Sequence, residues 1–87
     1  MKSTEFTIKS ENGIHARPAG RLTEVAKKFS SSVTLQKAGN DKEVDAKSIF
    51  SVMGLGAKKG EILSVLISGA DEEEALIAIK EFLEKEL

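Results

Sequence analysis

Apolar and polar positions change period along the first third of the chain, which predicts a strand followed by a helix. Phe6 and Ile8 alternate with polar neighbours, the pattern of a half-buried strand. The turn pair Asn12-Gly13 ends this pattern. Helical spacing then starts at about His15 or Ala16, with Pro18 in the first turn, where its missing N–H costs nothing. The apolar stripe of this helix comprises Ala19, Leu22, Val25, Ala26 and Phe29.

The middle of the chain predicts two short strands and a short helix. Val33 and Leu35 alternate with polar residues after a serine run, and a turn over 38–41 separates them from Val44 and Ala46. Apolar spacing over 49–55 then suits about two helical turns. Ser48 stands directly before this helix and is a good N-cap residue.

The last third predicts a strand over 61–68 and a final amphipathic helix. Asp71 is expected to cap that helix, and Asp71-x-x-Glu74 approximates a capping box. The element order is therefore βαββαβα, which implies an antiparallel sheet under a layer of helices. Ile62 and Leu66 should face away from the apolar residues of the same strand, on the uncovered side of the sheet. Two such neighbours could mark an extra contact or a dimer.

Composition restricts the classes of function. The 87 residues are 40% hydrophobic and 31% charged, so we expect one globular domain over residues 1–87. A formal charge of −1 argues against nucleic-acid binding, and the lack of cysteine with a single histidine argues against a metal site. No signal peptide or long apolar run is present, so we expect a cytoplasmic protein that does not enter a membrane.

The candidate chemistry lies at the start of the first helix. His15 is the only histidine, and Arg17 follows two residues later. An imidazole ring is largely unprotonated at cytoplasmic pH, and its free nitrogen can accept a phosphoryl group. The unpaired N–H groups of a helical first turn and a guanidinium fork both stabilise the resulting anion. A lone histidine before a helix is more often an ordinary surface or capping residue, so this reading depends on its neighbours.

Two further segments extend the evidence beyond Gly13-Ile14-His15-Ala16-Arg17-Pro18-Ala19, namely the segment from Lys47 to Gly56 and the segment from Ser68 to Ala75. On these three motifs the chain resembles the HPr phosphocarrier family of the bacterial sugar phosphotransferase system. The resemblance covers essentially the whole chain. It implies an α+β open-faced β-sandwich, with four antiparallel strands and helices on one face.

The resemblance implies a phosphoryl relay and a carrier rather than an enzyme, with no cofactor. Enzyme I would phosphorylate His15 at Nδ1, and the carrier would pass the group to IIA domains of sugar permeases. Arg17 would stabilise the phosphate and Asn12 would orient the imidazole by a hydrogen bond. Ala16 and Pro18 would support the phosphate from the helix start.

The resemblance also implies a regulatory site and a docking surface. Ser48 matches the serine that HPr kinase/phosphorylase modifies in bacteria that use this carrier for catabolite control, through a catabolite-control repressor. A two-turn helix cannot bury all its apolar residues, so we expect Ile49 and Phe50 to be exposed and Met53 to have a mixed role. The expected docking residues are Gly20, Arg21, Ile49, Phe50, Met53 and Leu55. Gly20 departs from the Ala, Thr or Ser usual in the family, and Arg21 adds a second cation.

Two alternatives stay open at this stage. One is a regulatory carrier, serving a nitrogen-related branch or acting as a Ser48-phosphorylated corepressor. The other is a small module that binds an anionic ligand or partner at the same helix start without phosphotransfer. We expect the chain to be a monomer.

Overall fold

The computed structural model describes residues 1–87, and its elements follow the predicted order βαββαβα. They are β1 (Lys2–Thr7), α1 (Ala16–Lys27), β2 (Ser32–Lys37), β3 (Glu43–Asp45), α2 (Ile49–Gly54), β4 (Ile62–Ser68) and α3 (Glu72–Glu86). The predicted helix start at residue 15 or 16 is confirmed. The fourth strand begins one residue later than predicted, at Ile62.

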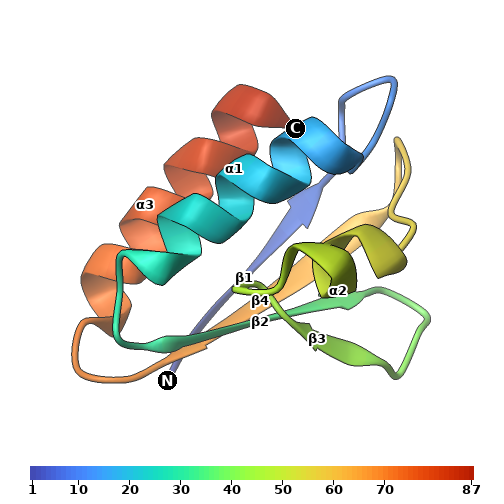
Figure 1. Cartoon of the computed structure of the whole chain (residues 1–87). Coiled ribbons are helices and arrows are strands. Elements are labelled where there is room, and N and C mark those ends of the chain that lie inside the picture. Colours follow the sequence, from blue (N-terminus) through green and yellow to red (C-terminus); the bar gives the residue numbers. More distant parts are fainter.

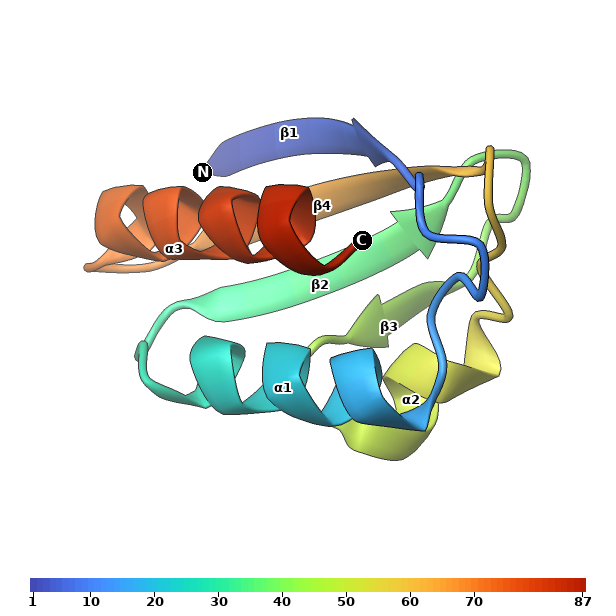
Figure 2. The ribbon, with the colours of Figure 1, turned by 90° about the horizontal axis from the view of Figure 1, so that it is seen from above.

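The four strands form one antiparallel sheet in the order β1-β4-β2-β3. α1 and α3 lie side by side across one face, and α2 covers the end of the sheet near β3 (Figures 1 and 2). The other face has no helix on it (Figure 2). The predicted α+β open-faced β-sandwich is therefore confirmed.

The core lies between the sheet and the helices. β4 is one of the two inner strands of the sheet, and its Leu63, Val65 and Ile67 are fully buried on the face that the helices cover. Ile62 and Leu66 face the opposite side of the sheet, as predicted. Ile62 is 38% exposed and Leu66 is half-buried. None of the three helices is both long and apolar enough to cross a membrane.

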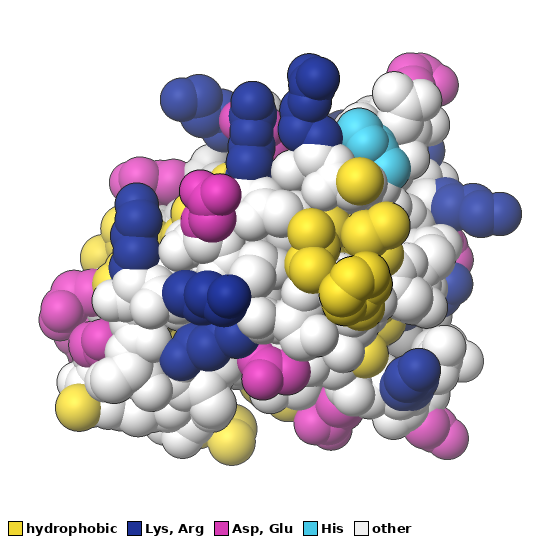
Figure 3. Space-filling view, viewed as in Figure 1, with side chains coloured by type: hydrophobic (Ala, Val, Ile, Leu, Met, Phe, Trp, Pro, Cys, Tyr) yellow, Lys and Arg dark blue, Asp and Glu magenta, His cyan; other side chains and the backbone are white.

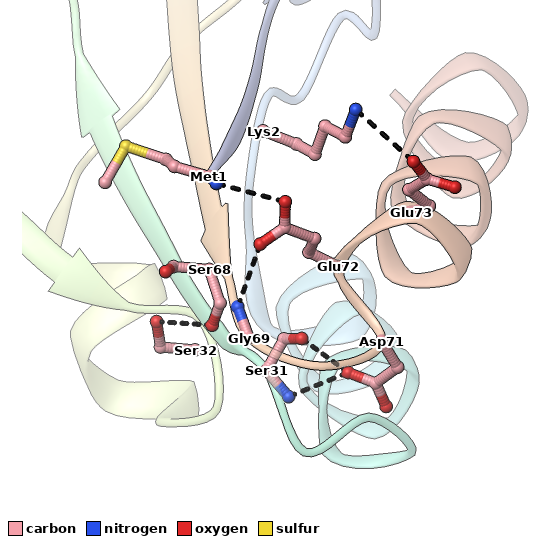
Figure 4. Close-up of polar contacts among 9 residues, drawn as sticks. All are labelled: Met1, Lys2, Ser31, Ser32, Ser68, Gly69, Asp71, Glu72 and Glu73. Atoms are coloured by element: carbon pink, nitrogen blue, oxygen red, sulfur yellow. Dashed lines mark hydrogen bonds and ion pairs between the residues drawn. The ribbon is translucent and has the colours of Figure 1, made fainter.

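The predicted capping of α3 is wrong. Asp71 occupies the N-cap position, but its side chain makes no capping hydrogen bond. Its carboxylate instead accepts hydrogen bonds from the backbone amide of Ser31, at 2.9 Å, and from the Ser31 hydroxyl (Figure 4). It also accepts the backbone amide of Ser30 at 3.0 Å. The Ser31 hydroxyl and the Ser30 amide are the main causes that lower the pKa of Asp71 to about 2. Because Ser31 is buried and needs partners for its polar groups, the acid is drawn away from its own helix.

Glu72 supplies the polar contact at the start of α3 that Asp71 does not make. Its carboxylate accepts the amide of Gly69 at 3.1 Å and lies 3.0 Å from the N-terminal ammonium of Met1 (Figure 4). These two contacts, with the Gly69 amide the larger, lower the pKa of Glu72. Glu72 therefore connects the beginning of β1 to the beginning of α3.

Candidate functional site

The segment that leads into α1 is fixed on two distant parts of the chain. The amides of Lys9 and Ser10 both donate to the carbonyl of Leu87, at 2.6 and 2.7 Å. Ile8 exchanges backbone hydrogen bonds with the start of β4, donating to Glu61 at 2.9 Å and accepting from Gly60 at 2.8 Å. Because the end of α3 and the β4 turn hold one end of this loop, its position depends on the complete fold.

Gly13 fixes the other end of the loop by close packing. Its φ of +60° favours glycine, and a Cβ there would lie 2.4 Å from the carbonyl oxygen of Ala57 and 2.9 Å from Cα of Lys58. The same Ala57 oxygen accepts the amide of Ile14 at 3.0 Å. Only glycine fits between this loop and the segment after α2. His15 is therefore placed by contacts on the residues immediately before it.

His15 lies at the N-cap position of α1 with extended backbone, at φ −130° and ψ −170°. Its carbonyl accepts the amide of Ala19 at 2.9 Å, as the first bond of the helix. Its side chain is exposed and makes no capping hydrogen bond. A typical N-cap side chain would be occupied by the helix amides, so the free imidazole is unusual for this position. No hydrogen bond within the protein occupies either of its ring nitrogens.

The first turn of α1 leaves backbone donors beside the ring. The amides of Ala16 and Arg17 have no acceptor in the protein. Pro18 follows in the same turn, where it is buried and has no N–H to satisfy. Unpaired amides and the positive end of the helix dipole together suit an anion at this position.

The two arginines of α1 have different environments. Arg21 is 2.9 Å from the carboxylate of Glu86 on α3, so its charge is partly neutralised within the molecule. Arg17 is exposed and forms no ion pair or side-chain hydrogen bond. Arg17, to which the resemblance assigns the phosphate, is therefore the guanidinium that remains available to an anion near His15.

The orienting bond expected from Asn12 is not formed. Asn12 is exposed, and no hydrogen bond joins its side chain to His15. It lies in the turn in which the amide of Gly13 donates to the carbonyl of Ser10 at 3.1 Å. Asn12 is thus part of the loop that leads to His15, without a bond to the imidazole.

Ser48 is the N-cap residue of α2, as predicted, and its hydroxyl accepts the amide of Ser51 at 3.4 Å. The preceding residue makes a contact that sequence reasoning missed. The ammonium of Lys47 donates to the carbonyl of Phe29 at 2.8 Å, just beyond the end of α1. A lysine beside an N-cap gives no local signal for a partner 18 residues earlier in the chain. The bond connects the start of α2 to the end of α1.

α2 presents an apolar surface on the same side of the molecule as the histidine, where Figure 3 shows apolar side chains gathered close to the imidazole. Phe50 is 83% exposed and Met53 is 40% exposed. Ile49 is only half-buried rather than exposed, because it packs against the core beside Gly20 of α1. Leu55 was predicted as a docking residue, and this is wrong. It is 5% exposed and belongs to the core, because it lies one turn after the buried Val52 on the same side of the helix.

An open-faced sandwich with this element order is the fold of a class of small phosphocarrier proteins. The chain matches the family model described as "PTS HPr component phosphorylation site" over residues 2–85, and it therefore belongs to the HPr family.

Solved structures agree with this assignment. HPr-C-His from Thermoanaerobacter tengcongensis is 40% identical, with a TM-score of 0.90 over 98% of this chain and 93% of that chain. The histidine-containing phosphocarrier protein of Mycoplasma is 34% identical, with a TM-score of 0.91 over 97% and 93%. Crh, the Bacillus subtilis catabolite repression protein solved as a domain-swapped dimer, is 33% identical, with a TM-score of 0.76 over 100% and 98%.

Proposed function

We propose that this protein accepts a phosphoryl group from Enzyme I on His15 and passes it to IIA domains of sugar permeases. The observation that carries the proposal is the free, exposed imidazole at the N-cap of a 12-residue helix. Unpaired amides and the unpaired Arg17 surround the same position. A nucleophile and the groups that stabilise its product anion thus occupy one exposed corner of the molecule.

The transfer needs no group beyond the two proteins. The lone pair of His15 Nδ1 attacks phosphorus, and the bond from phosphorus to the donor group on Enzyme I breaks, with its electron pair returning to that donor. The amides of Ala16 and Arg17 and the Arg17 guanidinium stabilise the phosphoryl oxygens. Pro18 holds the first turn in helical geometry, and Asn12 supports the loop. A nucleophile of the IIA domain then attacks phosphorus, and the bond from phosphorus to Nδ1 breaks with its electron pair returning to the His15 ring.

The exposed apolar residues of α2 provide the docking surface. Phe50 and Met53 would form its centre, because aromatic and methionine side chains contribute strongly to interfaces when they become buried. Ile49 and Gly20 lie against each other and would border this centre, and Arg21 of the same helix would add a cation to the docking surface. The same surface serves Enzyme I and the IIA domains in turn, so its contacts must be weak enough for partners to exchange.

Ser48 is the proposed regulatory site, modified by HPr kinase/phosphorylase with ATP. A phosphate would add about −1.5 to −2 charges directly beside Ile49 and Phe50. Partners that meet an apolar surface flanked by Arg17 would be repelled. The chain is similar in sequence and fold to Crh, whose name refers to catabolite repression. This similarity favours a second role for the Ser48-phosphorylated protein, as a partner of a catabolite-control repressor.

Incubation with Enzyme I, magnesium and labelled phosphoenolpyruvate tests the relay. We expect base-stable, acid-labile label on the parent protein and none on His15→Ala. Arg17→Ala should accept label more slowly, whereas Lys42→Ala, at an exposed lysine in the 38–43 loop, should match the parent. Absence of label on the parent would favour an anion-binding interaction module instead.

HPr kinase/phosphorylase and ATP test the regulatory site. Acid-stable label should appear on the parent and be absent from Ser48→Ala. In addition, Ser48→Asp should lower the rate of phosphoryl transfer from Enzyme I to His15, whereas Ser51→Asp, one turn further along α2, serves as a matched charge control. Equal rates for Ser48→Asp and the parent would contradict the regulatory proposal.

A further inference from the structure

Lys58 lies in the segment after α2, next to the loop that carries His15. A Cβ on Gly13 would lie 2.9 Å from Cα of Lys58, so the two backbones are in contact at this point. His15 is only two residues beyond Gly13, and consecutive Cα atoms are about 3.8 Å apart, so the Cα of His15 is within about 8 Å of Gly13. The flexible four-carbon stem of a lysine can span the remaining distance to a group bound on the imidazole.

The side chains of His15 and Lys58 face solvent at the same corner of the molecule. The amide of Ile14 donates to the carbonyl of Ala57 at 3.0 Å, and both of these residues are buried. The residue that follows each of them, His15 or Lys58, is exposed. In the view of Figure 3, basic side chains lie on two sides of the histidine. The bond between two buried residues thus holds an exposed histidine and an exposed lysine near each other.

The backbone of Lys58 is fixed, whereas its ammonium is free. Its amide donates to the carboxylate of Glu61 at 2.7 Å, and its carbonyl accepts the amide of Glu61 at 3.0 Å. The ammonium forms no ion pair, because the Glu61 carboxylate lies 3.4 Å from the ammonium of Lys37 instead. The next residue, Lys59, is different, since its ammonium is 2.5 Å from the carboxylate of Glu11. Lys58 is therefore the lysine of this segment whose charge remains available to an anion.

We propose that Lys58 binds the phosphoryl group carried on His15, as a second cation beside Arg17. The proposal rests on the relay described above. When phosphorus bonds to Nδ1, the ammonium of Lys58 donates a hydrogen bond to a phosphoryl oxygen, and Lys58 neither gives up its proton nor forms a covalent bond. Arg17 approaches this oxygen set from α1 and Lys58 approaches it from the segment after α2. Because an ammonium is a compact charge on a flexible stem, it can follow the phosphoryl group as it arrives and leaves.

A phosphorus NMR titration of the purified phosphoprotein tests this contact in the absence of any partner. Enzyme I, magnesium and phosphoenolpyruvate first phosphorylate the parent, Lys58→Ala, Lys58→Arg and Lys59→Ala. A nearby cation favours the more negative form of the phosphohistidine, so its removal should raise the pKa that the phosphorus chemical shift reports. In Lys58→Ala the proton dissociation constant should fall about two- to fivefold, the range of an exposed ion pair. Lys58→Arg and Lys59→Ala should titrate with the parent.

The outcomes separate this proposal from the relay itself. Equal titration of Lys58→Ala and the parent would overturn the role of Lys58 while leaving His15 as the acceptor. Equal shifts in Lys58→Ala and Lys59→Ala would also overturn it, because net charge rather than a contact would then set the pKa. A shift in Lys58→Arg as large as that in Lys58→Ala would exclude a cation as the cause. If Enzyme I does not phosphorylate the parent, the relay is contradicted, and this proposal with it.

Discussion

Replacing Gly13 by alanine is the sharpest test of how the fold presents His15. The substitution adds one methyl group to a residue whose φ is +60°. That methyl would lie 2.4 Å from the carbonyl oxygen of Ala57, far inside van der Waals contact. The same oxygen accepts the Ile14 amide, so any displacement breaks the last bond before the histidine.

The expected magnitude has three parts. Left-handed backbone costs a non-glycine residue about 1–2 kcal/mol. Displacement of the Ala57 segment resembles overpacking of a core, which costs about 1–3 kcal/mol. Loss of the hydrogen bond from Ile14 adds about 1 kcal/mol. The total is about 3–6 kcal/mol, which in a domain of this size lowers Tm by at least about 12 °C.

Gly56→Ala is the matched control, because its φ of +62° is nearly the same and no atom lies within 4 Å of its Cβ position. Its free energy of unfolding should fall only by the cost of left-handed backbone, about 1–2 kcal/mol. Urea denaturation gives both stabilities, and phosphorylation by Enzyme I below each Tm reports on the histidine. Gly13→Ala should be clearly less stable and slower to phosphorylate than the control. Equal stabilities would refute the close approach of Gly13 and Ala57.

Three further predictions concern Asp71, Thr23 and Leu87. The folded-state pKa of Asp71 is about 2 against an ordinary 3.8, so its contribution to stability is present above pH 3.8 and is lost as pH falls towards 2. The stability gap between the parent and Asp71→Asn, measured by urea denaturation, should shrink across that interval, and a constant gap would contradict it. Thr23→Val should raise Tm, because the buried Thr23 hydroxyl has no partner and its removal gains about 1 kcal/mol; a lower Tm would indicate a hydrogen bond at this hydroxyl. Leu87→Ala should cost about 2 kcal/mol and speed amide exchange at Lys9 and Ser10, and unchanged exchange there would argue against anchoring by this residue.

The order of elements was predictable because the spacing of apolar residues and the positions of turn-forming residues and proline are local properties of the sequence. Leu63, Val65 and Ile67 alternate with polar or opposite-facing residues, which is enough to assign the buried face of β4. Pro18 restricted the start of α1 to within a turn. The exposed His15 and the N-cap role of Ser48 followed from these same boundaries.

Two errors, at Asp71 and Leu55, concern which part of the molecule a side chain contacts. Asp71 had its own helix amides within reach, yet it binds Ser31, which is 40 residues away and buried. Leu55 and Phe50 are both apolar residues of the α2 segment, but Leu55 lies one turn after the buried Val52 and belongs to the core. The ion pair of Arg21 was not predicted either, because its partner Glu86 lies 65 residues away in the sequence.

The bonds from Lys9 and Ser10 to the Leu87 carbonyl have a consequence for biosynthesis. The ribosome adds the residues of α1 before those of α3, so the histidine is synthesised well before Leu87, which anchors its loop. While α3 is still missing, the imidazole is not yet held at a helix end. The proposed phosphoryl acceptor is therefore complete only once α3 has docked, and partly synthesised chains would be poor acceptors.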